Sequence, residues 1–164
     1  MWFNLFAFNI SWLGLILSGN SFIPAVISWL LLHIFLSPNK PAEIRLLVFV
    51  ACIGIGVDFA LTYLNIFQFN QEQFFPVWLM VLWIAFAATL NHSLAFLSVN
   101  RVYQWLAGTI FAPLSYLAGE RLGAVTFGLD NLPTYLLLAL LWGPLMLLFF
   151  YIKANCLTKG VHYA

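Results

Sequence analysis

Residues 44–67 read IRLLVFVACIGIGVDFALTYLNIF, an apolar run whose charged side chains are Arg45 near its start and Asp58 in its second half. A run of this length is sufficient to cross the ~30 Å hydrocarbon core of a bilayer as an α-helix. Hydrocarbon offers no partner to a backbone amide, so a crossing segment must satisfy its own hydrogen bonds. The stretch therefore predicts a transmembrane helix, and much of the remaining chain has the same character.

The composition of the whole chain agrees with this prediction. Of 164 residues, 64% are hydrophobic and only 7% are charged, and the mean hydropathy is +1.00. A soluble chain of this length would have too little polar surface to cover itself. The net charge of +1 argues against a nucleic-acid partner, which requires a concentrated basic face. Cys52 lies inside an apolar run and Cys156 lies beyond the last one, so no disulfide between them is expected.

The pattern predicts an all-α polytopic membrane protein, a bundle of six transmembrane helices forming a single transmembrane domain over residues 1–164. The expected helices cover residues 2–18, 22–36, 44–67, 76–98, 102–118 and 133–152. Residues 2–18 lack the basic start and small-residue cleavage site of a secretory signal, so they are expected to remain as a helix. Residues 119–132 are Gly-rich and too polar to cross, which favours a re-entrant or interfacial segment.

The basic residues predict an orientation. With the N-terminus in the cytoplasm, Arg121 is the basic residue left on the outer side, and the others fall inside: Lys40, Arg45, Arg101, Lys153 and Lys159. The excess of Lys and Arg on cytoplasmic loops therefore favours cytoplasmic N- and C-termini.

One group of polar residues is expected in the outer half of the membrane. A rise of ~1.5 Å per residue places Asp58 and Tyr116 at nearly the same depth, roughly 20 Å from the cytoplasmic side. Ser115 adjoins this level, and Glu120 and Arg121 follow one turn further out. Ionisable residues inside a membrane are candidates for function, so these five form the first candidate site. The alternative role for Asp58 is a structural hydrogen bond or an ion pair with Arg121.

A second group is expected nearer the cytoplasm: His92 and Asn91 of the fourth helix, Asn9 of the first and His33 of the second. His92 is a candidate acid/base, or else it makes a structural hydrogen bond, for example to Asn9. The histidines have no partner at metal-ligand spacing in the sequence, so no metal site and no cofactor are predicted, and a haem held by His33 and His92 has weak support.

Three motifs carry a family resemblance. Residues 87–94, AATLNHSL, and residues 113–124, PLSYLAGERLGA, together with Gly56-Val57-Asp58, resemble the signatures of domain of unknown function family 2878. The resemblance covers essentially the whole chain and implies a small bacterial inner-membrane protein with no established activity. Some members of that family carry a permease label. Asn9 stands where relatives are expected to have glutamine.

Three classes of function remain open. The first is a small transporter or permease, or a lipid- or solute-binding protein, using Asp58 with Tyr116, Glu120 and Arg121; a homo-oligomer would help six short helices to form a pathway. The second is an intramembrane enzyme acting on a lipid or isoprenoid, with His92 as acid/base and Asn91 orienting the substrate. The third is a non-catalytic assembly subunit. Membrane lipids are the expected surroundings in all three cases.

Overall fold

A computed structural model describes residues 2–69 and 74–158, and these are almost entirely helical. The elements in chain order are α1 (Trp2–Ser18), η1 (Gly19–Phe22), α2 (Ile23–Leu36), α3 (Lys40–Tyr63), β1 (Phe67–Gln68), α4 (Val77–Leu90), η2 (Ala95–Val99), α5 (Arg101–Arg121), β2 (Thr126–Phe127) and α6 (Asn131–Thr158). Lys159, which the orientation places on the cytoplasmic side, lies outside the described residues.

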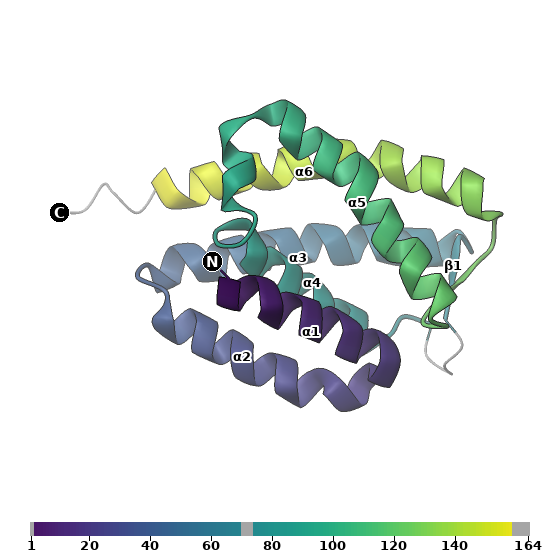
Figure 1. Ribbon diagram of the computed structural model, residues 1–164, viewed down its shortest axis with the longest axis horizontal. Helices are drawn as coiled ribbons and strands as arrows, with labels where there is room; N and C mark the ends of the chain where they lie inside the picture. Colours follow the sequence, from purple (N-terminus) through teal and green to yellow (C-terminus); the bar gives the residue numbers. More distant parts are fainter. Residues whose placement is uncertain (1, 70–73, 159–164) are drawn as a thin grey trace.

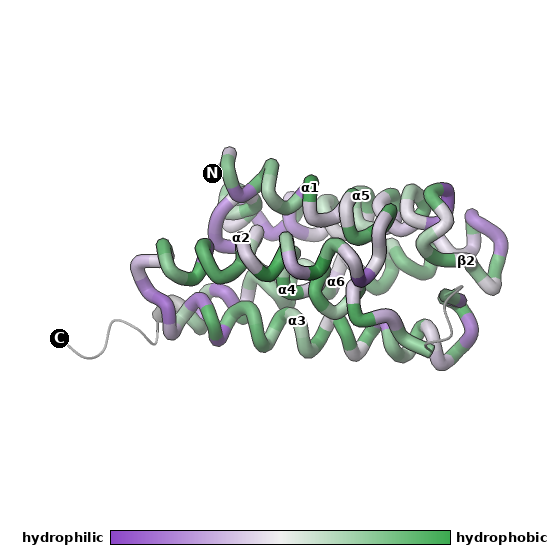
Figure 2. Tube along the Cα trace, turned by 90° about the horizontal axis from the view of Figure 1, so that it is seen from below, coloured by the Kyte–Doolittle hydropathy of each residue, from purple (hydrophilic) through white to green (hydrophobic). Residues whose placement is uncertain are grey.

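Helices α2, α3 and α6 run roughly along one long axis, and α5 crosses this direction obliquely (Figure 1). Helix α4 is the central element, because it packs against α1, α2, α3 and α6, while α5 packs mainly against α6. The α2–α3 connection and the C-terminal end of α6 lie toward the same end of the bundle, and β1 lies at the opposite end (Figure 1). Hydrophilic colouring gathers toward these two ends (Figure 2).

Three helical stretches among the described residues are long and apolar enough to cross a membrane. They are Trp2–Leu36, Lys40–Tyr63 and Asn131–Cys156, and α4 is a shorter apolar helix. Large apolar side chains also cover the outer surface: Phe35 is 72% exposed, Phe111 69% and Leu140 73%. Apolar surface of this extent requires an apolar environment. The protein is therefore a helical membrane protein.

Several predicted boundaries are wrong, and capping explains two of them. Helix α3 begins at Lys40 rather than at residue 44, because the Asn39 side chain accepts a hydrogen bond from the Ala42 amide and Pro41 fits the first turn. Helix α5 begins at Arg101, where the Asn100 side chain accepts a hydrogen bond from the Val102 amide. It then continues to Arg121, beyond the predicted end at 118.

The fourth helix ends at Leu90, not at 98, and the residues that follow form a turn and then η2. The side-chain oxygen of Asn4 in α1 accepts hydrogen bonds from the amide and the hydroxyl of Ser93, at 3.3 and 2.7 Å. This contact from α1 holds the backbone in the turn, so His92 lies in a turn rather than inside a helix.

The expected re-entrant or interfacial segment has a different local structure. Residues 119–121 complete α5, and β2 pairs antiparallel with β1, Phe67 opposite Phe127 and Gln68 opposite Thr126. The third helix accordingly ends at Tyr63 instead of 67. Asn65 follows with a positive φ of 58°, which turns the chain into β1. Helix α6 is longer than predicted at both ends, Asn131–Thr158 instead of 133–152.

Candidate functional site

Asp58 lies on α3 at the centre of the bundle and is completely buried. The Trp83 indole N–H from α4 donates to its Oδ2 at 2.7 Å, and the Tyr116 hydroxyl from α5 donates to Oδ1 at 2.8 Å. Buried charges and carboxyls in a membrane are expected to be paired in this way. The Asp58 carboxyl therefore links three helices.

The packing around this carboxyl is close and aromatic. The Trp83 ring stacks on Trp142, with centroids 5.1 Å apart and planes within 5°. Gly54, one turn before Asp58, makes room for Trp83, because a Cβ at this position would lie 2.1 Å from the indole ring. The ring of Tyr116 stacks on Phe67 at 5.1 Å.

The other members of the first candidate group do not reach Asp58. The Ser115 hydroxyl donates to the Ala112 carbonyl of its own helix. Among the described residues, the side chains of Glu120 and Arg121 make no hydrogen bond or ion pair, and Arg121 is exposed. The proposed Asp58–Arg121 ion pair is absent, since Trp83 and Tyr116 occupy both carboxyl oxygens.

A cavity of about 90 Å³ lies beside this group and is lined by Tyr116, Ser115 and aromatic side chains of α1 and α4. Asp58 and Glu120 are not part of its lining. The cavity thus reaches the tyrosine but not the carboxyl behind it.

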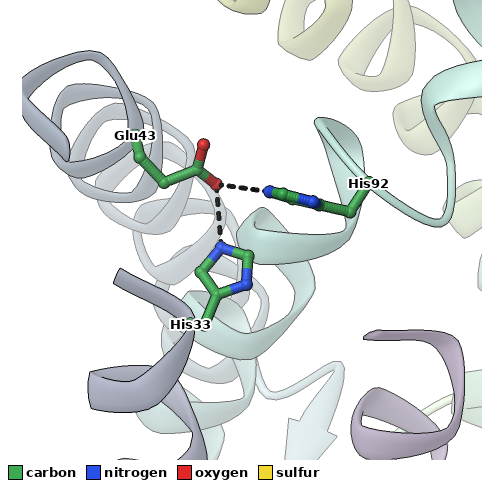
Figure 3. Close-up of side chains that lie close together, drawn as sticks. All are labelled: His33, Glu43 and His92. Carbon is green, nitrogen blue, oxygen red and sulfur yellow. Dashed lines mark hydrogen bonds and ion pairs between the residues drawn. The ribbon is translucent and has the colours of Figure 1, made fainter. Parts of the chain in front are cut away.

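The second candidate group contains a cluster that the sequence interpretation did not include in full. His33 Nε2 lies 2.9 Å from Glu43 Oε1, and His92 Nε2 lies 3.4 Å from the same oxygen (Figure 3). The Asn91 amide donates to Glu43 Oε2 at 3.0 Å. Among the described residues, these three ligand-type side chains, His33, Glu43 and His92, are placed so that they could hold a metal ion.

Local structure brings the three side chains together. His33 is in the last turn of α2 and Glu43 in the first turn of α3, and the short turn between the two helices places them side by side. An acidic residue is favoured in a first helical turn because it faces the positive end of the helix dipole. His92 enters from the turn after α4, which Asn4 holds in place.

Asn9 is not the residue that joins α1 to this region. Its side chain is exposed and donates to the Leu5 carbonyl, whereas buried Asn4 donates to the Ala88 carbonyl at 3.0 Å and accepts from Ser93. The expected His92–Asn9 hydrogen bond is absent. Both asparagines lie on one short helix, and only the packing of α1 against α4 distinguishes them.

Sequence reasoning missed three residues that the structure brings into play. Trp83 had a signal, because an indole N–H in the middle of an apolar helix needs an acceptor. Glu43 lies one residue before the predicted third helix, residues 44–67, and is not among the predicted site residues. Lys153 serves in the sequence analysis only to orient the chain, and in the structure its amino group is buried and donates to the Leu90 carbonyl and the Ser98 hydroxyl, both at 2.8 Å.

A groove of about 1020 Å³ runs between α1 and α5. Leu5, Phe8 and Trp12 form its α1 side, while Trp142 and Met146 of α6 are also part of its lining. Asn9, Ser93 and Ser115 are among the few polar groups that reach it. His92 is not part of its lining, although Ser93 follows it in the chain.

The family model described as "Protein of unknown function (DUF2878)" matches residues 1–148. The chain belongs to this family. The resemblance drawn from residues 87–94, residues 113–124 and Gly56-Val57-Asp58 is therefore confirmed. No curated protein and no solved structure matches the chain.

Proposed function

We propose that this protein binds a membrane amphiphile, with the hydrocarbon chain of the ligand lying in the groove between α1 and α5. The observation that supports the proposal is the groove itself, about 1020 Å³ in volume and lined almost entirely by apolar side chains. Ligand sites are typically concave and mostly apolar, with a few polar groups that fix orientation. Asn9, Ser93 and Ser115 are such groups here.

The surroundings of the groove favour a lipid over a soluble ligand. Its two walls, α1 and α5, expose large apolar residues such as Phe6, Leu17 and Ile110 on their outer surfaces. An opening between two such helices faces acyl chains, not water. A molecule entering from the side therefore comes from the bilayer, and its hydrocarbon part matches the lining.

The polar groups suggest where the headgroup lies. Ser93 and the N-terminal residues of α1 and α5, Trp2 and Tyr103, line the same end of the groove. Tryptophan and tyrosine are typical of the boundary between hydrocarbon and headgroups. In this arrangement the headgroup of the amphiphile lies at this end of the groove, and its hydrocarbon chain extends along the groove toward Ala118.

The proposal includes a topology of six crossings in a bacterial inner membrane, with both termini on the cytoplasmic side. Support comes from the basic residues: Arg45 donates to the Cys156 carbonyl and Lys153 to the Ser98 hydroxyl, so these cations lie at one end of the bundle. Arg121 ends α5 and is exposed toward the other end. An excess of cations marks the cytoplasmic side.

A second candidate function is an intramembrane enzyme acting on the amphiphile that occupies the groove. The specific observation is that Ser93 lines the groove while its neighbour His92 contacts Glu43. Two adjacent residues of the turn after α4 thus contact a lipid-sized groove and a cluster of ionisable groups. Transport through the Asp58 group has less support, because both oxygens of that carboxyl are bonded and fully buried.

The test uses the full chain in lipid nanodiscs that contain a phospholipid with a photoactivatable group in its acyl chain. Cross-linked peptides are mapped by mass spectrometry. Labelling is expected to concentrate on α1 and α5, and Ala112→Trp and Ala118→Trp, which fill the groove, are expected to reduce it several-fold. Ala60→Trp on the exposed face of α3 is the matched control and should leave groove labelling unchanged.

Two outcomes contradict the proposal. One is labelling spread evenly over all lipid-facing helices and unaffected by Ala112→Trp. The other is a dimeric protein in which α1 and α5 are not labelled by the lipid, which would assign the groove to self-association.

A further inference from the structure

His33, Glu43 and His92 come from three different elements and converge on one point (Figure 3). Their ligand atoms, two imidazole nitrogens and a carboxylate oxygen, all lie within 4.8 Å of one another. His33 and Glu43 are almost fully buried, with side chains 6% and 2% exposed, whereas the side chain of His92 is 32% exposed. The exposed part of His92 lies away from the cluster, because its Nε2 atom is itself buried, so all three ligand atoms lie inside the protein.

The hydrogen bonds of the cluster leave one atom unsatisfied. His92 Nε2 is buried and, within the part of the chain that the structure describes, has no hydrogen-bond partner, although it lies 3.4 Å from Glu43 Oε1. Buried polar side-chain atoms nearly always have a partner, so an exception of this kind calls for an explanation. The atom points toward the same oxygen as His33 Nε2.

The spacing matches the ligand set of a tetrahedral metal site. Zinc–ligand bonds of ~2.0–2.1 Å at tetrahedral angles place neighbouring donor atoms roughly 3.3 Å apart. The two distances to Glu43 Oε1, 2.9 and 3.4 Å, lie close to this value, and all three ligand atoms lie within 4.8 Å of one another. The other carboxylate oxygen accepts a hydrogen bond from Asn91, which orients the carboxylate as an outer partner of a metal ligand would.

We infer that His33, Glu43 and His92 form a binding site for one divalent transition-metal ion of the zinc type. Two imidazoles select against magnesium and calcium, which prefer oxygen ligands. Two histidines and one glutamate are also the ligand set of zinc sites that keep a fourth position for water or substrate.

The neighbouring cations do not compete for the carboxylate. Lys153 Nζ donates to the Leu90 carbonyl and the Ser98 hydroxyl, and Arg45 Nη2 donates to the Cys156 carbonyl. Among the described residues, the ion-pair partners of Glu43 are the two histidines alone. With neutral imidazoles the cluster carries one negative charge, which a divalent cation compensates.

The test measures zinc binding to the full-length protein, purified in detergent with an affinity tag that contains no histidine and treated with a chelator. Isothermal titration with zinc and metal analysis after dialysis give affinity and stoichiometry. The wild type is expected to bind one zinc ion per chain, and Glu43→Gln and His92→Ala are expected to weaken binding at least about ten-fold. Glu120→Gln changes a carboxyl that lies outside the cluster and is expected to bind zinc as the wild type does.

Cobalt provides a second measurement on the same samples, because zinc itself has no visible spectrum. Four-coordinate Co²⁺ in the wild type should give a visible absorption band that His92→Ala removes. His92 is partly exposed, so this variant keeps the test decisive even where Glu43→Gln fails to fold. The inference is overturned if the wild type takes up no zinc, or if His92→Ala binds zinc as tightly as Glu120→Gln does.

Discussion

The contacts of Asp58 show how a single carboxyl organises this bundle. It accepts from Trp83 on α4 and from Tyr116 on α5 while its own backbone belongs to α3. A hydrogen bond to a charged group contributes roughly 1.5–3 kcal/mol, more than one between neutral groups. Groups that share one partner are also expected to be energetically coupled.

The first prediction concerns this coupling. Tyr116→Phe removes the hydroxyl alone, and Asp58→Asn keeps the size of the side chain; each is expected to destabilise the protein by about 1–3 kcal/mol. The double variant should lose less than the sum, with a coupling of at least about 0.5 kcal/mol. Unfolding of all four proteins in the same detergent measures the cycle. Strict additivity would show that the hydroxyl and the carboxyl do not interact.

Two glycines of α3 allow a matched second prediction. A Cβ on Gly54 would lie 2.1 Å from the Trp83 ring, whereas one on Gly56 would meet nothing within 4 Å. Gly54→Ala is therefore expected to cost about 1–3 kcal/mol through overpacking. Gly56→Ala should be neutral or stabilise the helix by up to about 1 kcal/mol. Equal effects of the two substitutions on unfolding would contradict the packing of Trp83 against Gly54.

At the scale of elements, the end of α4 depends on a contact from α1. Asn4 donates to the Ala88 carbonyl and accepts from Ser93, whereas Asn9 makes a local hydrogen bond within α1. The third prediction is that Asn4→Ala costs about 1–3 kcal/mol, because it leaves buried partners unsatisfied. Asn9→Ala should change the free energy of unfolding by less than about 0.5 kcal/mol. The reverse order would mean that Asn9 is the residue that holds the α4 turn.

Element types could be predicted from the sequence more readily than element ends. The apolar runs required helices wherever they met hydrocarbon, and α1 was predicted with its observed bounds, Trp2–Ser18. The end of α4 could not be predicted, because it depends on Asn4, which is 89 residues away from Ser93. The strands β1 and β2 are two residues each, too short to produce an alternating pattern.

Site residues within helices could likewise be predicted more readily than site residues whose contacts depend on turns. Asp58 and Tyr116 were grouped by depth along two helices, and the structure brings these two side chains together. Glu43 contacts both His33 and His92 but could not be predicted as a site residue. These contacts depend on the α2–α3 turn and on the turn after α4, which lies nearly fifty residues further along the chain. The depth of a residue along a straight helix does not predict contacts that depend on turns.

At the scale of the whole molecule, most of the basic residues lie at one end of the bundle. The α2–α3 turn, the start of α5 and the end of α6 carry Lys40, Arg101 and Lys153, and the β1–β2 end carries Arg121 and Asp130. A bundle of this kind has a preferred orientation in a membrane. The proposed metal site lies at the cationic end, beside the α2–α3 turn.

The most direct measurement is the accessibility of single cysteines in intact cells. In a variant with Cys52 and Cys156 replaced, Pro38→Cys marks the α2–α3 turn and Asp130→Cys the segment before α6, and both positions are exposed. A maleimide that cannot cross the membrane should label Asp130→Cys in intact cells but Pro38→Cys only after permeabilisation. Labelling of both positions in intact cells, or of Pro38→Cys alone, would contradict a bundle that crosses the membrane with its cationic end in the cytoplasm.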